Sequence, residues 1–301
     1  MIASAPQQDK NYSCALCGTL PVDEDSHIVP SFIIRWIKKT SATGYLRGTK
    51  EPNQRLQDGL KYPLLCKVCE DRFAEYESSF AREIFHPYAQ SQKTGMLYGS
   101  YCLKFFVSLV WRALHHLWLH KSSEETPMQP EFSGRLEEPY SRWREFLLDE
   151  SEHPQGFTVN VIPVDDVFRS TVPNTPKRPS QYNTGAVDMD LVCDSKSGFV
   201  YVKIPYFWVF GKIFAHRDDL FSKNTLIRRQ KGQLGGLNMS MPRSILEYVH
   251  SRSVLVEQAS QAMSLKQLET IKRAVEQNPE RVLASRSVKS AMLDERLRVD
   301  G

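Results

Sequence analysis

The sequence has no long uninterrupted hydrophobic run. Its most apolar stretch, residues 101–119, contains Lys104, Arg112 and a pair of histidines. Charges at these positions make it a poor membrane span and predict a buried helix instead. Residues 1–10 lack the apolar centre of a signal peptide. We therefore expect a cytoplasmic protein with no membrane partner.

Cysteine is scarce and the charge imbalance is small. The 301 residues include 6 cysteines, and 39 basic residues face 35 acidic ones, for a net charge of +4. Such a charge permits nucleic-acid binding but does not demand it. Hydrophobic content of 41% and charged content of 25% exclude a disordered chain. Cys102 and Cys193 are isolated in sequence, and we expect them to be small buried hydrophobes.

The other four cysteines form two Cys-x-x-Cys pairs, Cys14 with Cys17 and Cys66 with Cys69. In a reducing cytoplasm such pairs favour metal binding over disulfides, and two pairs place four soft thiolates around one tetrahedral Zn²⁺. Four thiolates leave no open coordination position, so the predicted zinc is structural. The alternative is four ordinary buried cysteines.

Secondary-structure signals place this zinc site in a small mixed module. Pro30 begins a predicted helix through Lys39, and residues 40–60 are rich in loop formers. Helical periodicity follows Cys69, so the second pair opens a helix, which we expect to end near His86-Pro87. The first cysteine pair forms a knuckle, in which Gly18 permits a tight turn. Together with the following hairpin and the second pair at a helix start, this knuckle predicts a treble-clef zinc fold.

The rest of the chain predicts an α+β protein. A second helix is expected over residues 140–148, and strands over 157–163, 186–192 and 199–210, with a hairpin turn at Asp194–Gly198. The C-terminal part reads as helical, with Ser264 and Gln267 as a capping box. We expect three parts: a zinc module over residues 10–90, a helical connector over 91–152, and an α+β domain of unassigned function over 153–301.

Three segments together resemble a known family. Cys14–Cys17, His27-Ile28-Val29-Pro30 and Leu65–Cys69 are similar to the zinc-stabilised HNH endonucleases, also called ββα-metal or His-Me finger nucleases. The resemblance covers about residues 14–85. It implies a ββα-metal fold and metal-dependent hydrolysis of phosphodiester bonds, most simply of DNA, as in a phage-defence or mobile-element nuclease.

The family pattern carries over in part. His27 matches the histidine that acts as general base and activates water. Ser26 stands at the first metal-ligand position, where a carboxylate or imidazole is expected, and Asp25 is a candidate substitute. Glu70 stands where the last histidine ligand belongs, and a carboxylate suits Mg²⁺ or Mn²⁺. The orienting asparagine falls near Lys61-Tyr62, where neither residue can replace it.

Each of these positions also has a structural explanation. His27 could hydrogen-bond within the hairpin or cap the following helix, and Glu70 could satisfy a helix dipole. Asp25 belongs to an acidic stretch typical of a solvated turn. The rival to an active nuclease is therefore a catalytically degenerate zinc module that binds nucleic acid or a partner protein.

Basic residues between the cysteine pairs are candidates for phosphate contacts, with Trp36 and Tyr45 interleaved for base stacking. An ordinary solvated helix face explains the same pattern. The four candidates are Arg35, Lys38, Lys39 and Arg47.

The C-terminal half contains no catalytic constellation. Asp188, Asp190 and Lys203 invite comparison with the PD-(D/E)xK nuclease core, but Tyr201 stands where that pattern needs an acid. Paired acids on a strand are usually surface residues. We expect this half to recognise a target, a partner protein or a second copy of itself.

Overall fold

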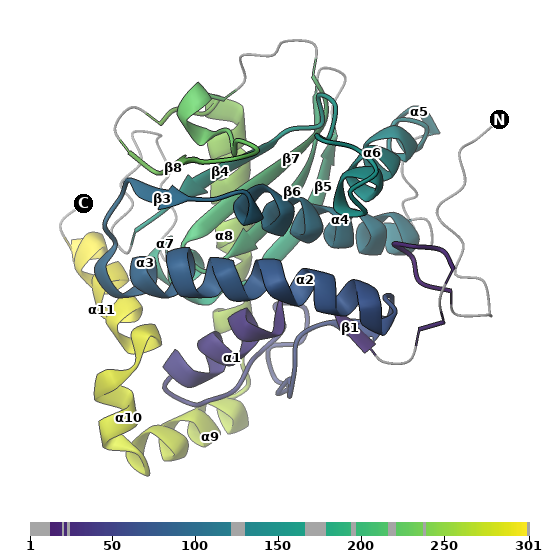
Figure 1. The fold of residues 1–301 in the computed structure, drawn as a ribbon. Coiled ribbons are helices and arrows are strands. Elements are labelled where there is room, and N and C mark those ends of the chain that lie inside the picture. Colours follow the sequence, from purple (N-terminus) through teal and green to yellow (C-terminus); the bar gives the residue numbers. More distant parts are fainter. Residues whose placement is uncertain are drawn as a thin grey trace.

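The structure is a computed structural model that describes residues 13–19, 21–22, 25–121, 130–165, 179–193, 197–215, 221–236 and 239–299. Within this part of the chain, helices cover both faces of a four-stranded sheet (Figure 1). The mixed α+β class is thus confirmed. The helices are α1 (Ser31–Thr40), α2 (Lys67–Phe80), the π-turn η1 (Ala81–Phe85), α3 (His86–Ser91), α4 (Tyr101–Lys121), α5 (Pro130–Ser133), α6 (Glu137–Leu147), α7 (Pro179–Gly185), the 3-10 turn η2 (Lys223–Thr225), α8 (Arg243–Gln261), α9 (Leu265–Glu276), α10 (Pro279–Ala284) and α11 (Arg286–Val299).

The strands form three antiparallel sheets. The main sheet has the order β4-β7-β6-β5, and two short ribbons pair β1 with β2 and β3 with β8. The expected hairpin turn between β5 and β6 includes residues 194–196, which lie outside the described residues. The strands are β1 (Asp25–His27), β2 (Lys61–Pro63), β3 (Met96–Tyr98), β4 (Val159–Pro163), β5 (Asp188–Cys193), β6 (Ser197–Ile204), β7 (Phe207–Ala215) and β8 (Gly232–Leu234).

The single strand expected over residues 199–210 is wrong, because the chain reverses within it. A turn at Pro205-Tyr206 separates β6 from β7, and the two strands pair antiparallel. Tyr206 has φ +68, and tertiary hydrogen bonds hold it: its N–H donates to Asn183 O, and its carbonyl accepts from Val164 N. Both strands are buried up to the turn, so no run of polar residues marks the reversal.

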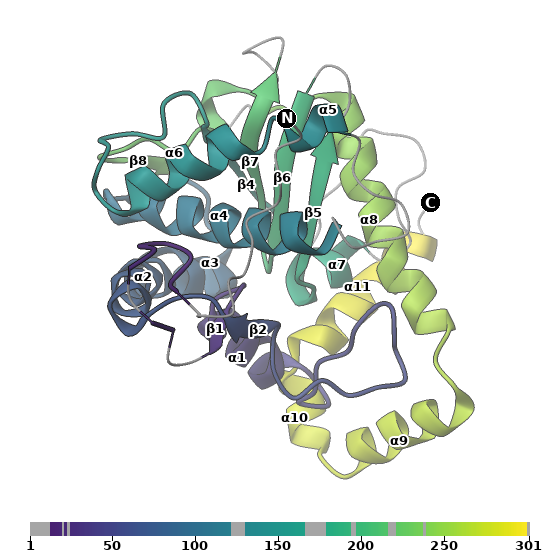
Figure 2. The same ribbon diagram turned by 90° about the vertical axis from the view of Figure 1, so that its right-hand side faces the viewer.

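Side chains of the main sheet alternate between two cores. Val200 and Val202 on β6 face the larger core, which includes α4, whereas Phe199 and Tyr201 face the smaller core with α8. Figure 2 shows the sheet between α4 and α6 on one side and α8 on the other. A strand buried on both faces reads as a continuous hydrophobic run, as β6 and β7 do.

Helix α4 is the buried helix predicted for residues 101–119. It packs against the sheet on one side and against α2 on the other. Phe105, Phe106 and Trp111 are fully buried. The helix is therefore apolar around most of its circumference because protein surrounds it. Among the described residues, no helix combines the length and apolar character that a bilayer crossing requires.

The predicted helix end near His86-Pro87 is wrong. Helix α2 continues through the π-turn η1 into α3, and the helical path ends at Gln92, which has φ +51. Pro87 occupies the first turn of α3, where its missing N–H costs little. The π-turn changes the local hydrogen-bond register, which lets the chain pass a proline without leaving the helix.

The N-terminal part brings β1, β2, α1 and α2 together. Helix α1 confirms the prediction for Pro30 to Lys39 to within a residue at each end. In the ribbon, Ser26 pairs with Tyr62 and His27 with Lys61. The loop between α1 and β2 contains one isolated bridge between Leu46 and Leu56 rather than a regular strand.

The same loop reaches the C-terminal helices. Asn53 Oδ1 accepts a 2.8 Å hydrogen bond from the N–H of Ser264, the residue that caps α9. The Ser264 side chain accepts from Gln267 N, which confirms the predicted helix start. Figure 2 shows this loop extending beneath α8 toward α9 and α10. Residues 46–56 are therefore fixed by segments more than two hundred positions away.

Candidate metal centre

The first cysteine pair lies on a tight turn. Gly18 N–H donates to Cys14 O at 2.7 Å, and Gly18 has φ +76, which a glycine adopts at low cost. Cys17 N–H lies 3.5 Å from Cys14 Sγ, an amide-to-sulfur contact typical of a zinc knuckle. Ala15 N–H donates to Leu64 O at 2.9 Å, which holds this turn against the segment that leads to the second pair.

The second pair opens helix α2, as predicted. Cys66 is the N-cap residue with extended backbone (φ −76, ψ 164), and Cys69 follows in the first turn. Cys66 O accepts from Glu70 N at 2.9 Å. The helix start thus places both thiols on the side that faces the knuckle.

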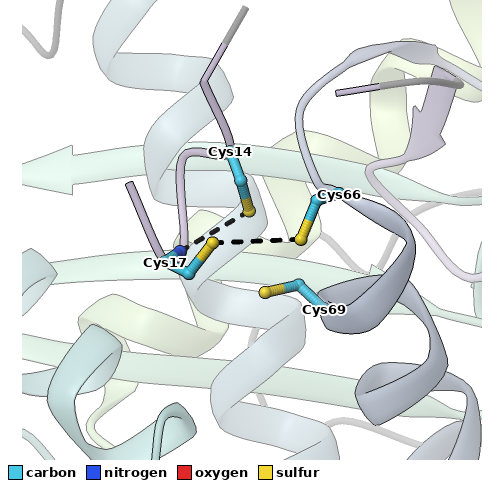
Figure 3. Close-up of side chains that lie close together, drawn as sticks. All are labelled: Cys14, Cys17, Cys66 and Cys69. Carbon is cyan, nitrogen blue, oxygen red and sulfur yellow. Dashed lines mark hydrogen bonds between the residues drawn. The ribbon is translucent and has the colours of Figure 1, made fainter. Parts of the chain in front are cut away.

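The four thiols converge on one point (Figure 3). Their sulfur atoms all lie within 4.8 Å of one another, and Cys17 Sγ is 3.8 Å from Cys66 Sγ. Tetrahedral Zn–S bonds of about 2.3 Å require sulfur atoms about 3.8 Å apart. Cys14, Cys66 and Cys69 are buried, and none of the four is in a disulfide. The residues therefore fit a closed tetrathiolate centre, compatible with a structural zinc ion.

Proton loss is strongly coupled within this group. A hydrogen bond from the Cys69 thiol lowers the pKa of Cys14 to about 4. The same hydrogen bond, followed by burial, raises the pKa of Cys69. One thiolate is thus well stabilised by its neighbours, whereas four thiolates this close repel one another unless a divalent cation neutralises them.

His27 ends strand β1 and lies beside Asp58, an acidic residue of the loop between α1 and β2. Its Nε2 lies 3.1 Å from Asp58 Oδ1, and its side chain is 22% exposed. Asp58 also accepts from Gly59 N at 2.8 Å and lies 3.5 Å from Lys61 Nζ. Burial acts to raise the pKa of Asp58, but His27 and the Gly59 amide outweigh it, so the net shift is downward. The carboxylate is therefore held in its charged form against the imidazole.

Helix α2 carries two glutamates, Glu70 and Glu77, on one face. Glu70 Oε1 is buried and has no hydrogen-bond partner among the described residues. Glu77, seven residues later, pairs with the buried Arg112 at 2.8 Å. Burial raises the pKa of Glu77, Arg112 opposes that shift, and the charges of Glu70 and His27 also contribute. Glu77 thus lies within electrostatic reach of both Glu70 and His27.

Arg112 of α4 links strand β1 to helix α2. Its side chain is 2% exposed, and its Nη1 donates to His27 O at 2.9 Å while its Nη2 contacts Glu77. Its guanidinium carbon lies 5.2 Å from the centre of the Phe73 ring. This one side chain therefore fixes the position of β1 relative to α2.

The residues at the altered ligand positions have different surroundings. Ser26 is buried, and its Oγ accepts from Leu65 N at 3.0 Å, so it ties β1 to the second cysteine segment. Asp25 is exposed at the start of β1 and shares a strand face with His27, because side chains alternate. Apart from the four cysteines, no three histidine, cysteine or acidic side chains among the described residues have ligand atoms within 4.8 Å of one another.

The four basic candidates separate into two pairs. Arg35 and Lys39 are exposed on the same face of α1. Lys38 and Arg47 are half-buried and hydrogen-bonded to main-chain carbonyls, Gln57 O at 2.7 Å and Pro52 O at 3.4 Å. Trp36 is partly buried and packs edge-on against Phe85 and Tyr206, so these core contacts occupy part of its ring.

The acids of β5 have structural partners. Asp188 receives two hydrogen bonds from Arg252 of α8, from Nη2 at 2.5 Å and from Nε at 2.8 Å. Asp190 accepts from Tyr248 OH at 2.9 Å. Lys203 is fully buried and donates to the carbonyls of Tyr182 and Ala186, and burial lowers its pKa. These charges join helix and sheet, unlike the solvated acids that their sequence suggested.

The sequence did not identify three residues near His27 as part of the site: Asp58, Glu77 and Arg112. Asp58 precedes a glycine in a polar loop, and Glu77 follows Glu70 by two helical turns, which were the available local signals. Nothing local connects Arg112 to a strand 85 positions earlier. Its charge in the middle of an apolar helix was the clue that a buried partner exists.

Comparisons with known proteins add no relative: no protein family, curated protein or solved structure matches this chain. Function is therefore inferred from the chain's own residues and their geometry.

Proposed function

We propose that the N-terminal residues, about 10–90, form a zinc-stabilised, HNH-like endonuclease module that hydrolyses phosphodiester bonds of DNA. The observation that supports this most is the placement of His27. It lies at the end of a two-stranded ribbon followed by a helix, 3.1 Å from a carboxylate, and within electrostatic reach of helix α2, whose Glu70 has a buried oxygen without a hydrogen-bond partner among the described residues.

The chemistry of a general base suits this arrangement. Asp58 Oδ1 lies 3.1 Å from Nε2 of His27. In this proposal the carboxylate favours the tautomer with the proton on Nε2, so that the lone pair of Nδ1 takes a proton from water. The main-chain bond from Arg112 to His27 O and the ribbon pairing with Lys61 fix the imidazole's backbone. A positioned base of this kind contributes about 10²–10⁴-fold to a hydrolytic rate.

A second metal completes the proposal. Glu70, with Asp25 as a further carboxylate on the same side of the ribbon as His27, would hold Mg²⁺ or Mn²⁺. Such an ion stabilises negative charge on the scissile phosphate and the leaving oxygen. Zinc in the tetrathiolate centre has no open position and serves the fold alone.

Exposed basic residues supply the contacts to the DNA backbone in this proposal. Arg35 and Lys39 are exposed on α1, where they would reach phosphates, although Arg35 also donates to Ser31 Oγ at 2.9 Å. Lys38 and Arg47 already bind carbonyl groups. Phosphate contacts position a duplex without reading its sequence. Target recognition or self-association falls to residues 153–301.

A non-catalytic zinc module that binds nucleic acid or a protein is the second candidate. Two observations favour it. Ser26 uses its hydroxyl to bind Leu65 N, so it offers no anionic ligand, and the described residues outside the cysteines contain no group of three converging ligand atoms. Binding without hydrolysis is what such a module predicts.

A plasmid-cleavage assay separates the two candidates. Purified protein is incubated with supercoiled DNA and Mg²⁺ or Mn²⁺, alongside His27→Ala and His153→Ala, an exposed histidine far from the site in sequence. Metal content is measured on all three proteins. Cleavage that only His27→Ala abolishes, at unchanged zinc content, supports the nuclease. DNA binding without cleavage, or equal cleavage by His27→Ala, refutes it.

A further inference from the structure

One feature that the proposed function leaves unexplained is a cavity between the N-terminal loop and the C-terminal helices. Its volume is about 480 Å³, within the usual range for small-molecule sites. It is enclosed by α1, by residues 45–60, and by parts of α7, β5, α8 and α11. Its apolar wall includes Ile34, Ile37, Leu46, Leu56, Met189 and Val256.

The charged residues that line this cavity are mainly cationic. Arg47 and Arg286 both line it, and Asp58 is the carboxylate among the described lining residues. Asp58 is already engaged by His27, Lys61 and the Gly59 amide. It therefore does little to neutralise the guanidinium groups across the cavity.

Arg47 keeps its charge without an anionic partner among the described residues. Its Nη1 donates to the carbonyl of Pro52 at 3.4 Å. The side-chain oxygen of Gln267, in the orientation that satisfies both of its amide atoms, accepts from Arg47 at 2.7 and 2.8 Å. Burial, and then the charge of the nearby Arg55, lower the pKa of Arg47. A half-buried cation that is held by neutral oxygens and lies near a second cation, Arg55, favours an anion nearby.

We propose that this cavity binds a small amphipathic anion, with an apolar body against α1 and α8 and its anionic group beside Arg47. Charge-assisted hydrogen bonds from a fixed guanidinium to a carboxylate, sulfonate or phosphate are stronger than its present bonds to neutral oxygens. The bound anion joins segments from both ends of the chain. The cavity shares Asp58 with the surroundings of His27, but its occupation requires no catalytic metal.

A matched pair of fluorescent probes tests the proposal. 8-Anilinonaphthalene-1-sulfonate carries the sulfonate, and N-phenyl-1-naphthylamine is nearly the same molecule without it. Both are titrated into the full chain and into Arg47→Gln, with Arg82→Gln as a control, since Arg82 is 69% exposed and does not line the cavity. Ala259→Trp fills the cavity from α8.

The expected result is saturable binding of one sulfonate probe, about tenfold tighter than the neutral probe. Arg47→Gln should remove that preference, Arg82→Gln should keep it, and Ala259→Trp should abolish binding of both probes. Equal affinity for the two probes in the wild-type chain would overturn the anionic class. Unchanged binding in a folded Ala259→Trp protein would overturn the site itself. Protein without added Mg²⁺ or Mn²⁺ should bind the sulfonate probe normally, so failure here is distinct from failure of the nuclease proposal.

Discussion

Replacing Arg112 with methionine should destabilise the protein severely, because Arg112 is a buried charge that three elements share. Its side chain is 2% exposed and contacts Glu77 at 2.8 Å and His27 O at 2.9 Å. Methionine fills a similar volume but leaves the Glu77 carboxylate, itself only 17% exposed, without its counter-charge. Removing one partner of a buried pair costs about 3–5 kcal/mol. We therefore expect a loss of about 3–5 kcal/mol in the free energy of unfolding.

The pH dependence of this loss has a definite direction. Burial raises the pKa of Glu77 above its usual value even in the presence of Arg112. A carboxyl group with a raised pKa in the folded state favours folding when protonated, and that contribution disappears as the pH rises through the folded pKa. Without Arg112 the pKa of Glu77 rises further. The loss caused by Arg112→Met should therefore be smaller at pH 5 than at pH 8.

Urea unfolding at both pH values measures this prediction. Arg82→Met is the control, because Arg82 is 69% exposed and its pair with Glu83 lies at the surface. Its effect should stay within about 0.5 kcal/mol. The double variant Arg112→Met with Glu77→Gln should lose less than the sum of the single variants. A loss below about 1 kcal/mol for Arg112→Met, or an equal loss at both pH values, would contradict the assigned role of the pair.

Two further variants probe the zinc centre and its surroundings. The purified chain should contain about one zinc ion, and Cys66→Ser should lose most of it because one of the four thiolates is gone. The control variant Cys193→Ser should retain the zinc. Elemental analysis of all three proteins measures this, and zinc retained by Cys66→Ser would exclude Cys66 as a ligand. Ser26→Ala should lose about 1–3 kcal/mol in urea unfolding at unchanged zinc content, because the buried Leu65 N–H loses its acceptor. A loss of metal in Ser26→Ala would instead place Ser26 close to a bound ion.

The sequence predicts those features whose causes are local. Cysteine spacing alone identifies the four thiols that converge, and Gly18 and the helix after Cys66 appear where the chain chemistry requires them. Helix α4 was predictable from its composition, and Ser264 from its capping pattern. In each case neighbouring residues contain the information.

Features that depend on distant contacts were beyond such reasoning. The turn at Tyr206 has a positive φ that hydrogen bonds to Asn183 and Val164 hold in place, and no glycine or asparagine marks it. The helical path past Pro87 depends on a π-turn that the chain accommodates by packing Phe80 and Phe85 in the core. The surroundings of His27 depend on Arg112, whose role appears only once α4 lies beneath the ribbon.

The position of α4 between the zinc-bearing segment and the main sheet makes metal loss a problem for the whole molecule. Both sides of this helix are apolar, and one continuous core extends from Cys14 through α4 to Leu234. A fragment that ends before α4 would expose the apolar side of α2 to water and should aggregate rather than fold. Chelation should therefore be detectable at a tryptophan as remote as Trp208, as a lowered melting temperature of the sheet and not merely as a frayed N-terminus.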